Sequence, residues 1–183
     1  MKKITGIYEL SVPLEGDITN SVVNFSAHDV SLVAVASNVF RLGRPVIGYG
    51  FNSIGRFAQT GILQGRMVPR ILNAEPASLV TENGDFFDPA VISSMAMSNE
   101  KPGGHGDRSG ALAAIELAIW DLNAKLADEP AWSWISKCHS TRVERLEVST
   151  YAAGGYYYST DSLVRLKDEL HRYRDLGFDA FKI

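Results

Sequence analysis

The chain has 183 residues, of which 45% are hydrophobic and 21% are charged, and its formal net charge at pH 7 is −3. This length and composition allow the chain to bury a core and predict one or two globular domains. Charges of both signs are mixed along the chain without a basic block, so neither nucleic acid nor an anionic membrane is an expected partner. The partner that we expect is a small molecule.

The single cysteine, Cys138, excludes an internal disulfide, and the four histidines are too scattered to form a zinc pattern with it. The first residues, MKKITGIYELSV, lack the long apolar run of a signal peptide. No segment approaches the roughly 20 apolar residues that a membrane span requires. We therefore expect a cytoplasmic protein.

The first elements predict a small antiparallel sheet. Apolar residues keep an approximate two-residue period from Ile4 to Val12, which is typical of a strand. Two β-rich runs between Val30 and Phe51 flank the turn RLGRP at Arg41 to Pro45. Together these patterns predict about three strands.

Helical patterns follow the strands. Apolar spacing predicts helices over Gly55 to Leu72 and from Asp88 through Met97. A third helix, Gly110 to Ala127, is apolar over most of its circumference and is therefore expected inside the structure. Asp107 or Ser109 is the expected N-cap of this helix.

After Arg142 the pattern changes to strand, helix, strand, over Arg145 to Ala153, Ser162 to Leu176 and Phe178 to Ile183. A helical crossover between two strands forms the βαβ unit of a parallel sheet. We place a domain boundary near residues 130 to 143. The prediction is an α+β domain over residues 1–130, followed by a linker and the beginning of an α/β domain over residues 131–183.

The last seven residues, GFDAFKI, alternate like a strand, but the sequence stops one residue after Lys182 with no turn. Two parallel strands cannot cover their own faces and edges. We therefore expect Phe178 to Ile183 to be exposed, or to pair with protein that lies outside this sequence.

Several stretches carry a resemblance to a known family. AAIELAIWDLNAKLADEPAWSWI, residues 113–135, resembles the last capping-domain helix of the enolase superfamily, in which an acidic residue, an Ala-x-Trp-Asp step, a Lys and a Pro recur in this order. GYGFNSIGRFAQTGIL, NEKPGGHGDRS and YAAGGYYY are similar to the D-tartrate dehydratase branch of the mandelate racemase-like proteins. One departure, Asp128 and Glu129 before Pro130 where a glycine is usual, concerns a turn.

The resemblance implies an α+β capping domain, with a three-stranded antiparallel sheet and helices, followed by the first βαβ unit of a truncated modified TIM barrel. The chain would thus be the N-terminal part of a longer enzyme. In the family the second barrel strand ends in Lys-x-Lys, and here FKI supplies Lys182 and stops before the second lysine. The second lysine is the family's base and the first tunes it, because two ammonium groups on one strand face lower each other's pKa. The alternative is that Lys182 ends a strand and reaches solvent.

The activity implied is dehydration of D-tartrate to oxaloacetate through an enediolate, with Mg²⁺ as cofactor and a homo-oligomeric assembly. The carboxylates that bind the metal in the family would lie beyond Ile183, so we expect the 183-residue chain to be inactive by itself. Two alternatives stay open. The enzyme could be a dehydratase or racemase of a longer acid sugar, or the chain could be a non-catalytic capping or oligomerisation module.

Three polar residues are the candidate substrate ligands: Asn20, Asn52 and Lys101. Matching positions in the family face the active site, and a cation with two amides suits a small hydroxy diacid. Either asparagine could instead be a turn or cap residue, and Lys101 could be a solvated loop charge.

Further candidates have equally plain alternatives. Arg56 could pair with a carboxylate or be an exposed arginine at a helix start, and His105 is expected to be structural or exposed. The loop KPGGHG lacks the Gly-Lys-Ser/Thr ending of a phosphate-binding loop. Tyr156 to Tyr158 could line the pocket, but we expect them to pack.

Overall fold

The computed structural model describes residues 1–16, 18–52, 57–101, 106–139 and 147–183. Two compact units can be distinguished. Unit 1 comprises Met1–Val12 and Asp29–Val143, and unit 2 comprises Pro13–His28 and Glu144–Ile183. The segment 13–28, which connects the first two strands, thus belongs with the C-terminal part of the chain.

Unit 1 contains a three-stranded sheet, as the sequence predicts. Its strands β1 (Ile4–Pro13), β2 (Asp29–Arg41) and β3 (Arg44–Phe51) lie in the order β1-β2-β3. β2 and β3 form an antiparallel hairpin whose two turn residues, Leu42 and Gly43, have φ angles of 50° and 74°. Two consecutive positive φ angles define the tight turn that matches the twist of paired strands.

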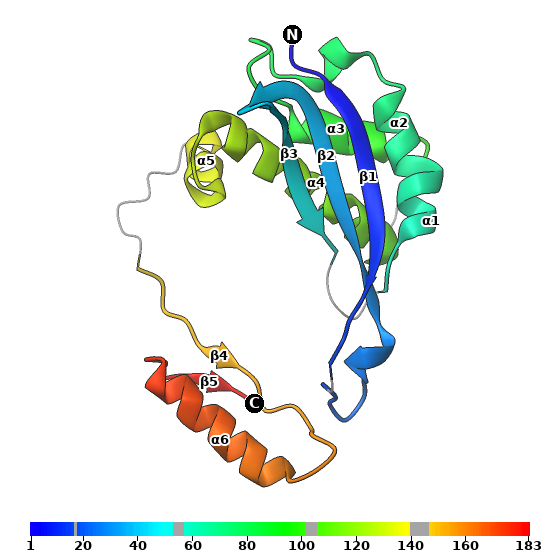
Figure 1. The fold of residues 1–183 in the computed structure, drawn as a ribbon. Coiled ribbons are helices and arrows are strands. Elements are labelled where there is room, and N and C mark those ends of the chain that lie inside the picture. The colour runs from blue at the N-terminus through cyan, green and yellow to red at the C-terminus, as the bar shows by residue number, and fades with distance from the viewer. Residues whose placement is uncertain (17, 53–56, 102–105, 140–146) are drawn as a thin grey trace. The chain divides into compact units, whose positions relative to one another are not determined.

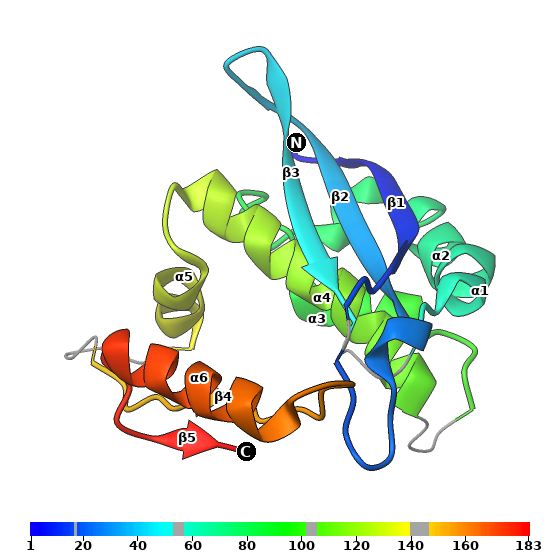
Figure 2. The ribbon, with the colours of Figure 1, turned by 60° about the horizontal axis from the view of Figure 1, so that its bottom comes forward.

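The helix α4 (Gly106–Ala127) crosses one face of this sheet (Figures 1 and 2). Gly48 and Gly50 of β3 make this approach possible, because a Cβ atom at either position would collide with a carbonyl oxygen of α4, at Ala118 and Ala114 respectively. The buried face of α4 is rich in alanine, which lets the helix backbone come close to the strand. The expectation of an internal helix is confirmed.

The edge of β3 is also bonded to α4. The Asp121 carboxylate accepts a hydrogen bond from the backbone N–H of Tyr49 at 2.7 Å, and Lys125 Nζ donates to the carbonyl of Ile47 at 3.0 Å. Lys125 also pairs with Asp121 at 2.6 Å. These side chains occupy backbone groups that an edge strand otherwise leaves open to pairing with another chain.

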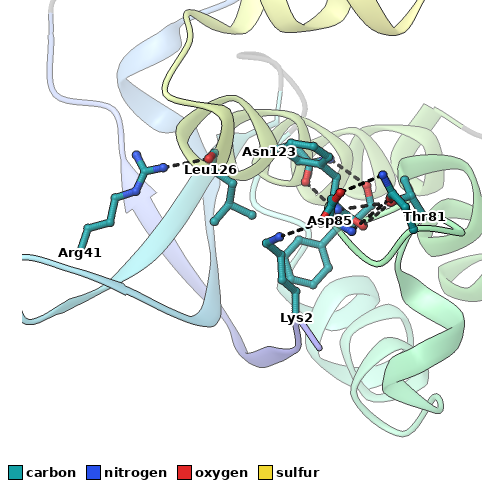
Figure 3. Close-up of polar contacts among 9 residues, drawn as sticks. Lys2, Arg41, Thr81, Asp85, Asn123 and Leu126 are labelled. Carbon is teal, nitrogen blue, oxygen red and sulfur yellow. Dashed lines mark hydrogen bonds and ion pairs between the residues drawn. The ribbon is translucent and has the colours of Figure 1, made fainter.

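Other polar contacts hold the second half of α4 (Figure 3). Asn123 is 1% exposed, and its amide accepts from the N–H of Phe87 at 3.0 Å and donates to the carbonyl of the same residue at 2.8 Å. Arg41, at the end of β2, donates to the carbonyl of Leu126 at 2.8 Å. The helix is therefore fixed both to the loop before α3 and to the hairpin.

The remaining helices pack around α4 and beside β1. The predicted helix over Gly55 to Leu72 begins at Thr60 in the described part and contains a π-helical turn immediately before the segment with Pro69, which has no N–H for the helical ladder. The bounds are α1 (Thr60–Ile62), η2 (Leu63–Met67), α2 (Val68–Leu72), η3 (Pro76–Leu79), α3 (Pro89–Ala96) and α5 (Ala131–Cys138).

The predicted starts of α3 and α4 had different outcomes. The helix predicted from Asp88 begins at Pro89, and Asp88 is its N-cap, because its carboxylate accepts from the N–H groups of Ala90 and Val91 at 2.9 and 3.1 Å. The prediction for α4 is wrong: the helix begins at Gly106, so Asp107 and Ser109 lie within its first turn and neither is the N-cap. A carboxylate in the first turn still interacts favourably with the helix dipole.

Unit 2 contains a parallel strand pair with a helical crossover, as predicted. β4 (Ala152–Ala153) pairs with β5 (Phe181–Lys182), and α6 (Ser162–Asp175) lies between them in sequence. Gly177, with φ of 94°, follows the end of α6.

The predicted strands over Arg145 to Ala153 and Phe178 to Ile183 are too long. Each strand has only two paired residues. Strand pairing extends only as far as both strands run side by side, and no third strand joins this pair within the part of unit 2 that the structure describes. Phe181 and Ile183 are 39% and 76% exposed, in agreement with the expectation of an exposed final strand. Arg145 and Leu146 lie outside the described residues.

Replacing Gly48 by alanine tests the contact between β3 and α4. Gly48→Ala should destabilise the protein by at least about 2 kcal/mol, because the backbone of α4 would have to move. Gly61→Ala in α1 is the matched control: a Cβ atom added there would meet no heavy atom within 4 Å, and alanine favours helix. Urea denaturation measures both variants, and equal stability of the two would contradict the assigned packing.

Candidate functional site

In unit 2 the segment 13–28 is joined to the chain that leaves β4. Thr19 Oγ1 donates to the carbonyl of Tyr157 at 2.8 Å, and the N–H of Tyr157 donates to the carbonyl of Thr19 at 2.8 Å. The rings of Phe25 and Tyr156 meet edge to face with centroids 6.1 Å apart. These contacts agree with the packing role expected of the tyrosine-rich stretch.

Asn20 lies in this segment and is exposed. Its side-chain oxygen accepts hydrogen bonds from the N–H groups of Val22 and Val23 at 2.9 and 2.8 Å, which is the geometry of an Asx turn. Its amide nitrogen donates to no other residue in the described ranges. The turn role is thus observed, and the side chain keeps a donor that a ligand could accept from.

Lys182 lies in β5 opposite Ala153, and its side chain is exposed. Its backbone is fixed, because its carbonyl accepts from the N–H of Gly154 at 2.9 Å. Gly155, with φ of 73°, lies against Ile183, and a Cβ atom there would come within 2.7 Å of the Cβ of Ile183. A glycine at position 155 is therefore required by its positive φ and by the close approach of Ile183 at the end of the parallel pair.

Glu169 of α6 bonds to the same turn. Its Oε2 accepts from the N–H of Gly155 and from the hydroxyl of Tyr158, each at 3.1 Å, and its Oε1 accepts from the Tyr173 hydroxyl at 2.6 Å. Burial opposes ionisation of Glu169, but these hydrogen bonds and the charge of Arg172 outweigh it and lower the pKa of the carboxyl. Burial and the Glu169 carboxylate raise the pKa of Tyr158, so its hydroxyl stays a donor.

In unit 1, Asn52 follows β3 and is 1% exposed. Its side-chain oxygen accepts from the N–H of Ser31 at 2.8 Å, and its amide nitrogen donates to the carbonyl of Phe57 at 2.7 Å and to Gln59 Oε1 at 3.1 Å. Both amide donors are therefore used inside unit 1. A structural role for Asn52 accounts for these contacts, and a contact between Asn52 and substrate stays a prediction.

The same network reaches the start of α4. The N–H of Gln59 donates to Ser31 Oγ at 2.8 Å, and Gln59 Nε2 lies 3.4 Å from the carboxylate of Asp107. A Cβ atom at Gly110 would lie 2.9 Å from the Gln59 amide, which explains a glycine inside this helix. Asn52 thus helps to join the end of β3 to Gln59 at the start of α1 and, through Gln59, to the first turn of α4.

Lys101 is exposed, and its carbonyl accepts from Arg108 Nη1 at 2.8 Å. The preceding residue, Glu100, is bonded to three arginines, from η2, α2 and α4. Sequence reasoning missed Glu100 and Glu169. For Glu100, the available signals were its position beside Lys101 and the four-residue spacing of Arg66 and Arg70 on one helical segment.

The structure thus assigns Asn20 and Lys182 to unit 2, and Asn52 and Lys101 to unit 1. Arg56 and His105 lie outside the described residues. Among the residues that the structure describes, no three or more His, Cys, Asp or Glu side chains are grouped so that they could hold a metal ion. Within those same ranges, no helix combines the length and the apolar character needed to cross a bilayer.

Sequence comparison finds a distant relative with a named activity. The chain is 27% identical over 81 residues to the arabinonate dehydratase of Saccharolobus solfataricus, a match that covers 44% of this chain and 20% of that protein. No family model matches the chain.

Two solved structures extend this likeness. A mandelate racemase/muconate lactonizing enzyme-like protein from Rubrobacter xylanophilus aligns with a TM-score of 0.62 at 18% identity, over 99% of this chain and 44% of that one. An enolase from Pseudomonas fluorescens Pf0-1, solved with bound magnesium, potassium and tartrate, aligns with a TM-score of 0.55 at 16% identity, over 86% of this chain and 35% of that one. The chain therefore spans less than half the length of these proteins.

At these identities the likeness shows the fold. The chain has a fold similar to part of the fold of the mandelate racemase/muconate lactonizing enzyme-like protein, and this part includes the three-stranded sheet with its helices.

The Glu169 hydrogen bonds make unit 2 sensitive to acid. Because the folded-state pKa of Glu169 lies below its ordinary value of 4.5, its contribution to stability is present above about pH 4.5 and is lost as the pH falls through the lower folded pKa. The protection factors of the amides of residues 152–175, which correct for the pH dependence of intrinsic exchange, should therefore decrease in the wild type as the pH falls below about 4.5.

Glu169→Gln should remove this pH-dependent loss of protection, because the amide cannot titrate in this range. Asp168→Asn, which changes an exposed carboxylate of the same helix, is the matched control and should keep the wild-type pH dependence. If all three proteins respond equally to acid, the pH dependence arises elsewhere.

Proposed function

We propose that the full-length protein is a dehydratase of acid sugars, with D-tartrate as substrate and oxaloacetate as product. The observation that carries the proposal is Lys182, exposed on the second strand of a parallel pair that follows a capping-domain fold. A relative named as a dehydratase and a structural neighbour that holds tartrate support the choice of chemistry.

In this proposal, β4, α6 and β5 form the first βαβ unit of a modified TIM barrel. The capping domain covers residues 1–130, and residues 131–183 are the linker and the start of the barrel. The complete enzyme is a homo-oligomer. Capping loops that close over a barrel mouth are a common way to select substrates, and segment 13–28, which bonds to the exit of β4, fits this arrangement.

The reaction removes the proton from the carbon beside one carboxylate and expels the hydroxyl from the neighbouring carbon as water. The resulting enol tautomerises to oxaloacetate, so the net loss is one water molecule. The proposed base is a lysine two positions after Lys182, and the ammonium group of Lys182 lowers the pKa of that lysine so that it is neutral near pH 7.

Three further side chains would bind the substrate. Lys101 pairs with a carboxylate, Asn20 donates from its amide nitrogen, and Asn52 contacts a hydroxyl or carboxylate if its internal hydrogen bonds rearrange. Mg²⁺ would stabilise the negative charge of the enediolate. The described residues supply no cluster of ligand groups for this ion. The roles proposed for Lys182, Asn20, Asn52 and Lys101 are stated without reference to the position of the ion.

A second candidate substrate is a longer acid sugar, which the likeness to arabinonate dehydratase favours. The full-length protein should be assayed with Mg²⁺ against D-tartrate, L-tartrate, meso-tartrate and five-carbon aldonates. Oxaloacetate formed from tartrate is followed by reduction to malate with NADH. Turnover of D-tartrate alone supports the main proposal, and turnover of an aldonate alone supports the second.

Absence of turnover with every acid sugar would refute both candidates and favour a non-catalytic capping module. The 183-residue chain assayed by itself is the negative control, since it lacks the proposed base lysine.

Lys101→Ala tests the proposed carboxylate contact in the full-length protein. The variant should lose about 2 to 4 kcal/mol in transition-state stabilisation measured by kcat/KM, with an unchanged Tm, because an exposed lysine contributes little to folding. Lys167→Ala, at an exposed lysine of α6, is the control and should match the wild type. Unchanged kinetics in Lys101→Ala would make Lys101 a solvated loop residue.

A further inference from the structure

Glu100 is the centre of a cluster of charged side chains in unit 1. Its side chain is only 7% exposed and accepts from Arg70 Nη1 at 2.9 Å, Arg66 Nη1 at 3.1 Å and Arg108 Nη1 at 3.1 Å. The side chains of Arg108 and Arg70 are 11% and 21% exposed. The Arg70 and Arg108 hydrogen bonds lower the pKa of Glu100, so it is ionised at neutral pH.

The turn after α3 directs Glu100 towards these arginines. Asn99 has a φ of 58°, a left-handed conformation that asparagine tolerates better than most residues. The N–H of Glu100 donates to the carbonyl of Met97 at 3.1 Å, which closes the turn. The chain direction is thereby reversed within a few residues of the end of the helix.

Two of the arginines also bind the backbone on either side of Glu100. Arg70 Nη1 donates to the carbonyl of Ala96 at 2.8 Å, and Arg108 Nη1 donates to the carbonyl of Lys101 at 2.8 Å. Arg108 therefore contacts both the Glu100 carboxylate and the Lys101 backbone. The position of Lys101 is fixed by a side chain of α4, and the orientation of that side chain is fixed by Glu100.

Three guanidinium groups converge on the one carboxylate of Glu100, and Lys101 is the next residue in the chain. Positively charged side chains gathered around a loop favour the approach of an anion.

We infer that Glu100 is a positioning residue for substrate binding: acting through Arg108, it fixes the backbone of Lys101 so that the ammonium group meets a carboxylate of a dianionic substrate. This inference rests on the proposed function. Ordering a backbone segment on binding costs conformational entropy, so holding the backbone of Lys101 in advance lowers the cost of binding.

Glu100→Gln in the full-length protein tests the inference, since it keeps the shape and removes the charge. KM for D-tartrate should rise about 10- to 100-fold while kcat changes less than about threefold, because the lost contact is made equally in the ground state and the transition state. Glu129→Gln is the matched control. Glu129 also pairs with a lysine, Lys137, at 2.5 Å, but this pair joins the end of α4 to α5, away from the first turn that carries Arg108, and the variant should keep the wild-type KM.

The double variant Glu100→Gln/Lys101→Ala separates positioning from a general structural effect. If Glu100 acts through Lys101, the KM of the double variant for D-tartrate should lie within about twofold of the KM of Lys101→Ala alone. If the fold-changes in KM caused by the two substitutions multiply in the double variant, the inference is wrong. Arg108→Lys keeps the charge but cannot make both hydrogen bonds, so it should also raise KM only when Lys101 is present. It replaces Glu100→Gln if that variant does not fold.

Hydrogen exchange gives a readout that does not depend on activity. The amides of residues 97–101 should exchange faster in Glu100→Gln than in the wild type, and those of β2 should not change. Unchanged exchange at residues 97–101 would refute the positioning role even in an active enzyme. A wild type that turns over no acid sugar would refute the proposed function, and with it the substrate role of Glu100, whatever the exchange result.

Discussion

The close approach of α4 to β3 is the constraint on which the structure of unit 1 depends. Gly48 and Gly50 leave room for the helix carbonyls, and the alanines of α4 leave room for the strand. Hydrogen bonds from Tyr49 to Asp121 and from Lys125 to Ile47 then fix the register between strand and helix. Because α4 is held in this way, its first turn has a defined place, and that turn carries Arg108 and Asp107.

Both candidate residues of unit 1 depend on this first turn. Asp107 receives the Gln59 amide that also contacts Asn52, and Arg108 binds the backbone of Lys101. In unit 2 a comparable function belongs to Glu169, which joins α6 to the glycine turn after β4. In each unit, then, a charged side chain from a helix fixes the loop beside a candidate ligand. This is the expected arrangement for binding residues on loops, which need support from rigid elements.

The sheet, the buried helix and the parallel strand pair could be predicted from local pattern. Two-residue alternation marks β1, the turn at Leu42 and Gly43 marks the hairpin, and the apolar circumference of α4 marks its burial. The start of α4 could not be predicted, because Asp107 and Ser109 have the same chemistry in a first turn as at an N-cap. The lengths of β4 and β5 were overestimated because alternation describes a strand but not its partner.

The supporting contacts of the candidate site depend on tertiary structure, so the local sequence around Asn52 and Glu100 does not contain them. Asn52 is bonded to Ser31, 21 residues away, and Glu100 is bonded to Arg66 and Arg70, 34 and 30 residues away. An asparagine after a strand is equally compatible with a ligand and with a buried connector. Only the positions of its partners distinguish the two.

The central claim is that Lys101, held by the Glu100 cluster, binds a carboxylate of an acid-sugar substrate. A crystal structure of the full-length protein with Mg²⁺ and an unreactive tartrate analogue tests this claim most directly. We predict one carboxylate of the analogue within about 3.2 Å of Lys101 Nζ. An analogue bound away from Lys101, with the Lys101 side chain directed into solvent, would contradict it.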